Sequence, residues 1–247
     1  MSITSAGRTD VGVIRSGNED NYLMVPDRGV FIVADGMGGH AAGEVASEMA
    51  VRIIARELGD ISSRTDREAS ERIRNSIIEA NAAIFQRTLS EQDKRGMGTT
   101  ATAMVVLGDN YLIGQVGDSR AYVLRKGDLL QLTKDHSYVQ EQVDAGYLSP
   151  EEARTHPYSN VITRCVGANV DVTPDVYSGA LQTGDVYLLA SDGLTGMIED
   201  EDLSEMMTRL TEPQQLADAL VDEANRRGGL DNVTVIVIRV DGPVDGV

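Results

Sequence analysis

The sequence is poor in cysteine, aromatic residues and basic charge. One cysteine, Cys165, excludes an internal disulfide, and with only three histidines there is no zinc-type Cys/His spacing, so Cys165 is expected to be a small packed side chain. Aromatic residues make up 4% of the 247 residues, and 22 Lys and Arg face 39 Asp and Glu, a net charge of −17. This charge repels phosphate backbones and anionic lipids, so neither nucleic acid nor a membrane is an expected partner.

Long apolar runs are also missing. No 18 apolar residues are consecutive, and the first twenty residues lack a basic start followed by an apolar stretch. We therefore expect a cytoplasmic protein. With 41% hydrophobic residues and 25% charged residues the chain can bury a core. No linker or repeat divides it, which predicts a single domain over 1–240 and a frayed tail at 241–247.

Short apolar runs rich in β-branched residues predict strands, and three of them are joined by tight turns, which indicates antiparallel pairing. The runs lie at 29–34, 100–107, 111–116, 121–125, 185–190 and 232–240. Helical periodicity appears at 44–58 and 67–89, and again around Leu216 and Leu220. Helices and strands are thus segregated, as in an α+β fold. The polar stretch 134–172 has few strand signals and is predicted to be an insertion.

Acidic residues recur where apolar runs begin or end. Alone, each is ordinary turn chemistry, since Asp caps backbone N–H groups and a neighbouring Gly tolerates positive φ. Together they would repel one another if the strand ends converge, unless a cation lies between them. The aspartates are Asp35, Asp118, Asp192 and Asp231, and a further acidic pair, Glu19 and Asp20, precedes a plausible strand at 22–25.

The type of ligand predicts the type of cation. Oxygen ligands with no Cys and almost no His favour Mg²⁺ or Mn²⁺ over zinc or copper, and no EF-hand loop is present. Two such ions bridged by one carboxylate can activate a water and orient a phosphoryl group for in-line attack. Arg15, in the same segment as Glu19, would supply a planar fork for phosphate oxygens.

Two other functions deserve comparison. Residues 36–41 match G-x-G-x-x-A after a predicted strand, as in dinucleotide-binding proteins, but that function requires a parallel strand after the helix, and a second helix follows instead. Ser119 in GDSR could be a hydrolase nucleophile, but no G-x-S-x-G elbow surrounds it. Ser119 is better explained as a turn residue.

Six ordered motifs resemble those of bacterial metal-dependent Ser/Thr protein phosphatases of type 2C, the PPM family. The likeness covers almost the whole chain. It implies an α+β fold, a four-layer αββα sandwich with two central antiparallel sheets and a flap at about 134–172. It also implies hydrolysis of phosphoserine and phosphothreonine by a metal-bridging water or hydroxide. The motifs are RSGNED (15–20), VADGMGGH (33–40), GMGTT (96–100), GDSRAY (117–122), SDGL (191–194) and DNVTVIV (231–237).

The resemblance assigns metal ligands. Asp35 would bridge two Mg²⁺ or Mn²⁺ ions. Asp192 and Asp231 would bind the first ion, and Glu19 with the Gly36 carbonyl would bind the second.

Further roles follow from the same motifs. Asp20 would act beside these ligands through water, and Asp118 with Asp192 would hold a third, weaker ion. Arg15 matches the arginine that binds phosphate, and it joins Asp35 among the expected catalytic residues.

The histidines depart from the animal pattern. Met37 stands where animal members carry a His proposed as general acid, and His40 is the bacterial-type histidine, either catalytic or simply at a helix start. His136 and His156, in or beside the flap, are expected to be structural or to face the substrate. The implied partners are phosphorylated proteins and an opposing Ser/Thr kinase pathway. The alternative is a module that binds phosphoproteins without hydrolysing them, although such a module would not need every metal ligand.

Overall fold

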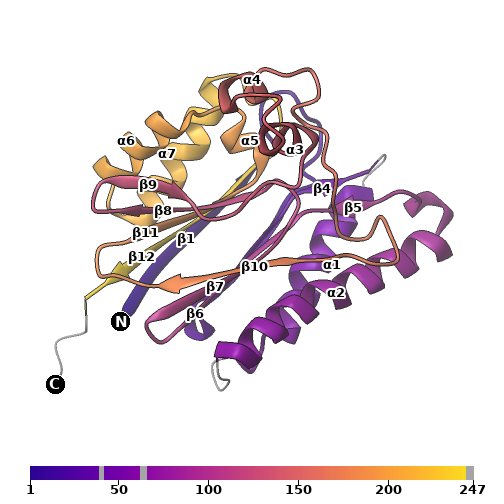
Figure 1. The fold of residues 1–247 in the computed structure, drawn as a ribbon, viewed down its shortest axis with the longest axis horizontal. Coiled ribbons are helices and arrows are strands. Elements are labelled where there is room, and N and C mark those ends of the chain that lie inside the picture. Colours follow the sequence, from indigo (N-terminus) through magenta and orange to yellow (C-terminus); the bar gives the residue numbers. More distant parts are fainter. Residues whose placement is uncertain (39–41, 62–65, 243–247) are drawn as a thin grey trace.

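The computed structural model describes residues 1–38, 42–61 and 66–242. Two five-stranded antiparallel sheets pack face to face, and helices cover both outer faces (Figure 1). This arrangement follows from the short apolar runs and the helical periodicity of the sequence. Strands with two apolar faces must be covered on both sides, by the other sheet and by helices. The predicted α+β sandwich is confirmed.

The first sheet carries the C-terminal helices on its outer face. Its strands run in the order β1 (Ser2–Asp10), β12 (Val233–Asp241), β11 (Val186–Ala190), β8 (Arg120–Arg125) and β9 (Asp128–Gln131). Leu188 and Val235 pack towards α6 (Asp200–Arg209) and α7 (Pro213–Arg226), whereas Leu189 and Ile236 face the other sheet. Successive residues of one strand therefore serve two different cores.

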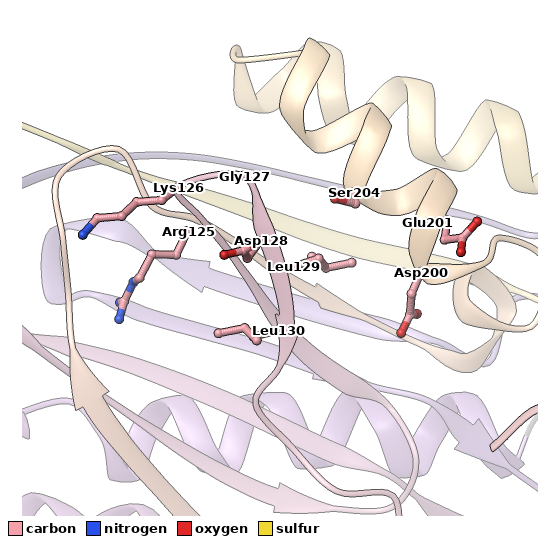
Figure 2. A pocket seen from close by; sticks show the side chains of 9 residues that line it. All are labelled: Arg125, Lys126, Gly127, Asp128, Leu129, Leu130, Asp200, Glu201 and Ser204. Carbon is pink, nitrogen blue, oxygen red and sulfur yellow. The ribbon is translucent and has the colours of Figure 1, made fainter. Parts of the chain in front are cut away.

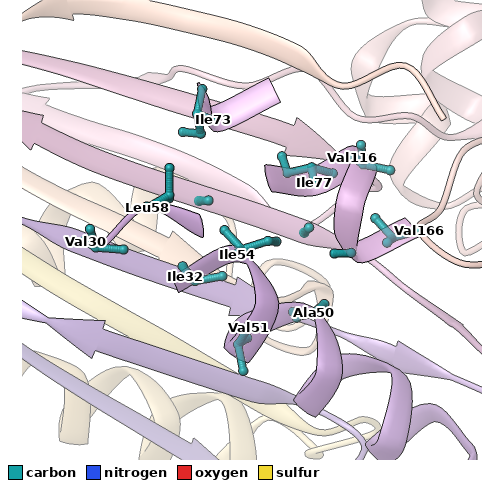
Figure 3. Close-up of a cluster of buried hydrophobic side chains, with 14 of the residues drawn as sticks. Val30, Ile32, Ala50, Val51, Ile54, Leu58, Ile73, Ile77, Val116 and Val166 are labelled. Atoms are coloured by element: carbon teal, nitrogen blue, oxygen red, sulfur yellow. The ribbon is translucent and has the colours of Figure 1, made fainter. Parts of the chain in front are cut away.

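The second sheet carries the two long N-terminal helices. Its strands run in the order β10 (Asp175–Ala180), β7 (Asn110–Val116), β6 (Ala101–Leu107), β3 (Val30–Ala34) and β2 (Asn21–Val25). Helices α1 (Ala42–Glu57) and α2 (Asp66–Ser90) cover it. Ile54 of α1 and Ile73 and Ile77 of α2 are fully buried in one cluster with Val30 and Ile32 of β3 (Figure 3), and the two α2 residues lie over Gly114 of β7.

Short elements gather at one end of the sandwich. They are the β4–β5 ladder (Gly36–Met37 and Gly98–Thr99), the 3-10 turn η3 (Gln92–Lys94), and helices α3 (Tyr138–Asp144), α4 (Pro150–Arg154) and α5 (Asp192–Thr195). The 3-10 turn η1 (Pro26–Arg28) instead joins β2 to β3 at the other end of these strands. Helices α3 and α4 lie in the predicted flap; in Figure 1 α4 lies above α5, and α3 lies beside α5 and above β4. Ser149 and Glu152 form a reciprocal capping box at α4. None of the helices in the described ranges is long and apolar enough to cross a membrane.

Several local expectations change. The predicted strands and long helices are present, but β1 and β10 are not obvious in sequence because their small and polar residues are mostly half-buried or exposed. Strand β12 extends through Asp241, where the tail was expected to begin, and pairs there with Ser2; residues 243–247 lie outside the described residues. The dinucleotide-binding interpretation is wrong, because every strand pairing in the described part is antiparallel and α2 follows α1.

Candidate active site

A cavity of about 250 Å³ lies where strand ends of both sheets and the flap come together. Polar and acidic side chains dominate its wall, and they come from seven separate segments of the chain. It brings together seven of the predicted site residues, namely Arg15, Glu19, Asp35, Gly36, Asp118, Asp192 and Asp231. Its other lining residues are Met37, Gly38, Thr100, Asn160, Ile162 and Asn232.

Among the predicted residues that the structure describes, Asp20 does not line the cavity. Asp20 is buried behind the wall, where it accepts a hydrogen bond from the Ser191 hydroxyl at 2.8 Å. Ser191 also accepts the backbone N–H of Thr234 at 3.0 Å, so Asp20 is tied to the strand that follows Asp231. His40 lies outside the described residues.

The acids of the site raise one another's pKa values. Burial, and then the carboxylates of Asp20, Asp192 and Asp118, raise the pKa of Asp35 well above its ordinary value. Burial and the Asp192 carboxylate raise the pKa of Asp118 to about 8, and burial raises the pKa of Asp20 to about 7. Burial also raises the pKa values of Asp192 and Glu19. The protein thus concentrates carboxylates that it does not neutralise with its own cations.

These residues suit a hard divalent cation. Oδ1 of Asp192 is buried without a hydrogen-bond partner among the described atoms, and a cation would satisfy it and offset the mutual repulsion. The donors are carboxylate and carbonyl oxygens, the ligands of Mg²⁺ and Mn²⁺. Within the described ranges no three acidic, His or Cys side chains already form a cage. Hydrated cations such as Mg²⁺ accept water oxygens as further ligands besides carboxylates.

Gly36 lets two chain segments approach each other closely. Its N–H donates to the Glu19 carbonyl at 3.1 Å. A Cβ atom at position 36 would collide with the backbone oxygens of Glu19 and Gly43, and one at Gly43 would collide with the Glu19 carboxylate. Gly36 and Gly43 therefore let the start of α1 lie against Glu19, a role that requires no dinucleotide.

Arg15 is already paired with an acid of the site. Its Nη2 donates to Oδ2 of Asp231 at 2.7 Å, with the arginine side chain 53% exposed. An exposed guanidinium at the cavity wall keeps donors available to a second anion, because five N–H groups share its planar fork.

Asn232 fastens the loop that carries Arg15 and Glu19. Its Oδ1 accepts the Glu19 N–H at 2.8 Å, and its Nδ2 donates to the carbonyls of Val11 and Gly17 at 2.8 and 2.9 Å. Sequence reasoning gave Asn232 no role. The signal that could have identified it is an Asn beside a candidate ligand, at the start of a strand.

A threonine pair fixes the backbone of Asp35 from both sides. Thr100 Oγ1 accepts the Asp35 N–H at 2.9 Å, while Thr99 Oγ1 and the Thr100 N–H donate to the Asp35 carbonyl at 2.9 and 2.8 Å. Ser119 is fully buried, with its Oγ 2.7 Å from that of Thr100. Ser119 is therefore a structural partner of this pair, and the serine nucleophile hypothesis is not supported.

His136 joins the flap to the Asp118 loop. Its Nδ1 accepts the Gly117 N–H at 3.0 Å, which leaves the proton on Nε2, 3.0 Å from Asp175. Burial lowers the pKa of His136. His156 instead packs its ring against Tyr138 and Tyr158 within the flap. Both histidines have structural contacts in the described structure.

A larger hollow lies between β9 and the start of α6 (Figure 2). It measures about 790 Å³ and is open. Arg125 at its edge is already bound by Asp185 through bonds of 2.9 and 2.7 Å, and none of the predicted site residues reaches it. The smaller cavity is the better candidate, because converging polar groups with shifted pKa values mark active sites more reliably than volume does.

Comparison with known proteins agrees with this geometry. Residues 15–223 match the family model "Protein phosphatase 2C". The serine/threonine phosphatase stp of Listeria monocytogenes is 40% identical over 238 residues, which cover 95% of this chain and 94% of that protein.

Solved structures agree in fold as well. The serine/threonine phosphatase PstP/Ppp of Mycobacterium tuberculosis superposes with a TM-score of 0.92 at 37% identity, covering 98% of this chain and all of that one. The catalytic domain of PstP, solved with two manganese ions, gives a TM-score of 0.88 at 37% identity over 97% of this chain and 99% of that one. A family model and a full-length relative both match over a cavity of converging carboxylates, and the chain therefore belongs to the protein phosphatase 2C family.

Proposed function

We infer that the protein is a metal-dependent protein serine/threonine phosphatase. The carrying observation is the cavity in which five carboxylates and Arg15 converge from distant parts of the chain. Stp and PstP are named as phosphatases of the same specificity, and their likeness to this chain supports the activity. The proposed catalytic unit is the single domain 1–240, with 134–172 as its flap.

We assign the carboxylates as metal ligands. The carboxylates of Asp20, Asp192 and Asp118 all raise the pKa of Asp35, so Asp35 has acids around it, which suits a ligand shared by two ions. Asp192 and Asp231 would hold one of them, and Glu19 with the Gly36 carbonyl the other. When bound, Mg²⁺ or Mn²⁺ ions supply the positive charge that acidifies water and screens the phosphate.

The other residues position these ligands and the substrate. Arg15 would hold phosphate oxygens while Asp231 orients its guanidinium. Asp20 would act from behind the wall through water. Asp118, with a pKa raised to about 8, would contribute to a third cation site shared with Asp192. Met37 lines the cavity but has no proton to donate, so proton transfer to the leaving group is not assigned to it.

The proposed substrates are phosphoserine and phosphothreonine in proteins, opposed in the cell by a Ser/Thr kinase. A cavity of about 250 Å³ has room for a phosphorylated side chain but not for the rest of a protein. The non-catalytic binding module is the competing function, and the complete ligand set argues against it.

A metal-dependent assay tests the function. Hydrolysis of p-nitrophenyl phosphate and of a phosphothreonine peptide is measured with EDTA, Mg²⁺ or Mn²⁺. We expect turnover of both substrates with Mn²⁺ or Mg²⁺ and none with EDTA, with release of inorganic phosphate as the readout. Binding of the phosphopeptide without phosphate release under every metal condition would instead identify a binding module.

A further inference from the structure

Three large apolar side chains are exposed next to the phosphate-binding arginine. Val13 is 62% exposed, Ile14 is 66% exposed and Leu230 is 57% exposed. They flank the Arg15–Asp231 ion pair in sequence, on the two loops that this pair joins. We call these three residues the rim patch.

Hydrogen bonds hold the rim patch in one arrangement. The N–H groups of Val13 and Ile14 both donate to the Gly229 carbonyl, at 2.8 and 3.2 Å. A Cβ built on Gly229 would lie 2.7 Å from Cγ2 of Val13, so the two loops are in direct contact there. Because the backbone is fixed, the patch is available for binding without a large ordering cost.

Neither the fold nor the chemistry accounts for these side chains. They belong to none of the buried clusters of the sandwich, and apolar groups cannot hold a cation or a phosphate. Single exposed hydrophobics are common on protein surfaces, but several at one mouth indicate an interaction surface.

The flap adds apolar surface to the same mouth. Asn160 and Ile162 line the catalytic cavity, and Val161 between them is 46% exposed. Tyr158, 57% exposed, packs edge-on against Tyr138 with ring centroids 5.9 Å apart. The two loops of the rim patch and the flap therefore offer apolar surface around a phosphorylated side chain in the cavity, whereas the cavity itself is acidic.

We propose that the rim patch binds a large apolar side chain of the substrate protein, one to three residues from the phosphorylated Ser or Thr. This inference rests on the proposed phosphatase function. Successive residues of an extended chain are about 3.3–3.6 Å apart, so such a neighbour reaches the loops beside Arg15 while the phosphate lies in the cavity. An acidic neighbour would instead meet Glu19 and Asp231.

Matched phosphopeptides test the preference. One peptide carries Leu or Phe at the positions around phosphothreonine, and the other carries Ser there. We expect the intact enzyme to hydrolyse the apolar peptide with about tenfold higher kcat/KM, in keeping with partial burial of one aliphatic side chain. In the V13S/I14S double variant the two peptides should have equal kcat/KM. Its kcat/KM for p-nitrophenyl phosphate serves as the reference, because that substrate is too small to reach the patch.

A control variant removes an equally exposed side chain elsewhere. Leu89, on α2, is 64% exposed, and L89S should leave the peptide ratio unchanged. Thermal melts show whether each variant is folded, and L230S provides a second test through the other loop.

Three results would overturn the inference. The first is equal kcat/KM for both peptides with the intact enzyme. The second is a V13S/I14S variant that still prefers the apolar peptide. If that variant also sediments differently from the intact enzyme, the patch joins copies of the chain and does not bind substrate. The third is that the intact enzyme hydrolyses neither p-nitrophenyl phosphate nor either peptide. Of the three results, only this one would also refute the proposed function.

Discussion

Two groups of buried aspartates in this protein have opposite surroundings. Asp135 and Asp185, away from the cavity wall, each receive an arginine in a forked arrangement, with shortest bonds of 2.7 Å from Arg120 and Arg125. Such pairing repays the cost of burying charge.

The cavity acids receive no comparable support. Asp35, Asp118 and Asp192 face one another, and burial raises the pKa of each. The only arginine bound to an acid of the cavity wall in the described part is the exposed Arg15, on Asp231. The comparison teaches that the fold neutralises Asp135 and Asp185 itself and leaves the cavity acids without such partners, as the proposed cation site requires.

Replacing the central cavity acid should have the largest effect. In D35N, the shared metal ligand is lost, so we expect turnover to fall by about 10³-fold or more. The metal-free variant should melt at the same temperature as the wild type or higher, because one member of a repelling cluster is neutral. Phosphate release and a thermal melt measure both effects. Turnover within tenfold of the wild type would show that Asp35 is not the shared ligand.

The structural acid should give the reverse result. D185N removes the buried carboxylate that binds the partly exposed Arg125 guanidinium, and loss of such charged hydrogen bonds costs about 1.5–3 kcal/mol. We expect a lower urea midpoint with unchanged kcat at temperatures where the variant is folded. If D185N loses turnover while keeping its stability, the division between structural and functional acids is wrong.

Removing the loop clamp should have an intermediate effect. N232A loses three hydrogen bonds to the segment that carries Arg15 and Glu19, and we expect metal affinity or kcat/KM to fall by about 10- to 100-fold. Mn²⁺ titration of activity measures it.

Asn81 offers a matched control for the clamp. It makes the same three kinds of bond, donating to the carbonyls of Asn169 and Val170 and accepting the Gly167 N–H, but it does not line the cavity. N81A should therefore lose stability without a change in apparent metal affinity. Equal losses of metal affinity in both variants would reduce Asn232 to a general stabilising residue.

The smallest effect concerns His136. Because burial lowers its folded-state pKa below the ordinary 6.5, the unfolded chain takes up a proton that the folded protein refuses as the pH falls below 6.5. The contribution of His136 to the free energy of unfolding is therefore fully present above pH 6.5. It is lost as the pH falls from 6.5 towards the lower pKa of the folded state. Urea midpoints at pH 7.5 and 5.5 should differ more in the wild type than in H136Q. An identical pH dependence would mean that other groups dominate.

The sequence predicted the strands with strong apolar runs more readily than the edge strands. Apolar, β-branched segments such as 185–190 have one stable environment, the inside of a sheet, so β11 was predictable. Strands β1 and β10 have mixed composition and become strands because a paired neighbour satisfies their backbone groups. Local propensity does not contain that information.

The site divides in the same way. The sequence was enough to predict the carboxylates at strand ends, the RSGNED arginine and the ordered motifs, because residue type and turn chemistry fix what each group can bind. The roles of Thr100, Ser119 and Asn232 could not be predicted, since a hydrogen bond between residues far apart in sequence leaves no local pattern.

The amino-acid sequence by itself thus determined the chemistry available to this protein: hard oxygen ligands, the guanidinium of Arg15 and an excess of negative charge. Only the tertiary structure decided which acids share a cavity and which are neutralised by arginine. It also joined the two loops of the rim patch through the Arg15–Asp231 ion pair. The physical reason is that electrostatic repulsion and hydrogen bonding depend on distances of a few Å, and those distances are set when two sheets pack.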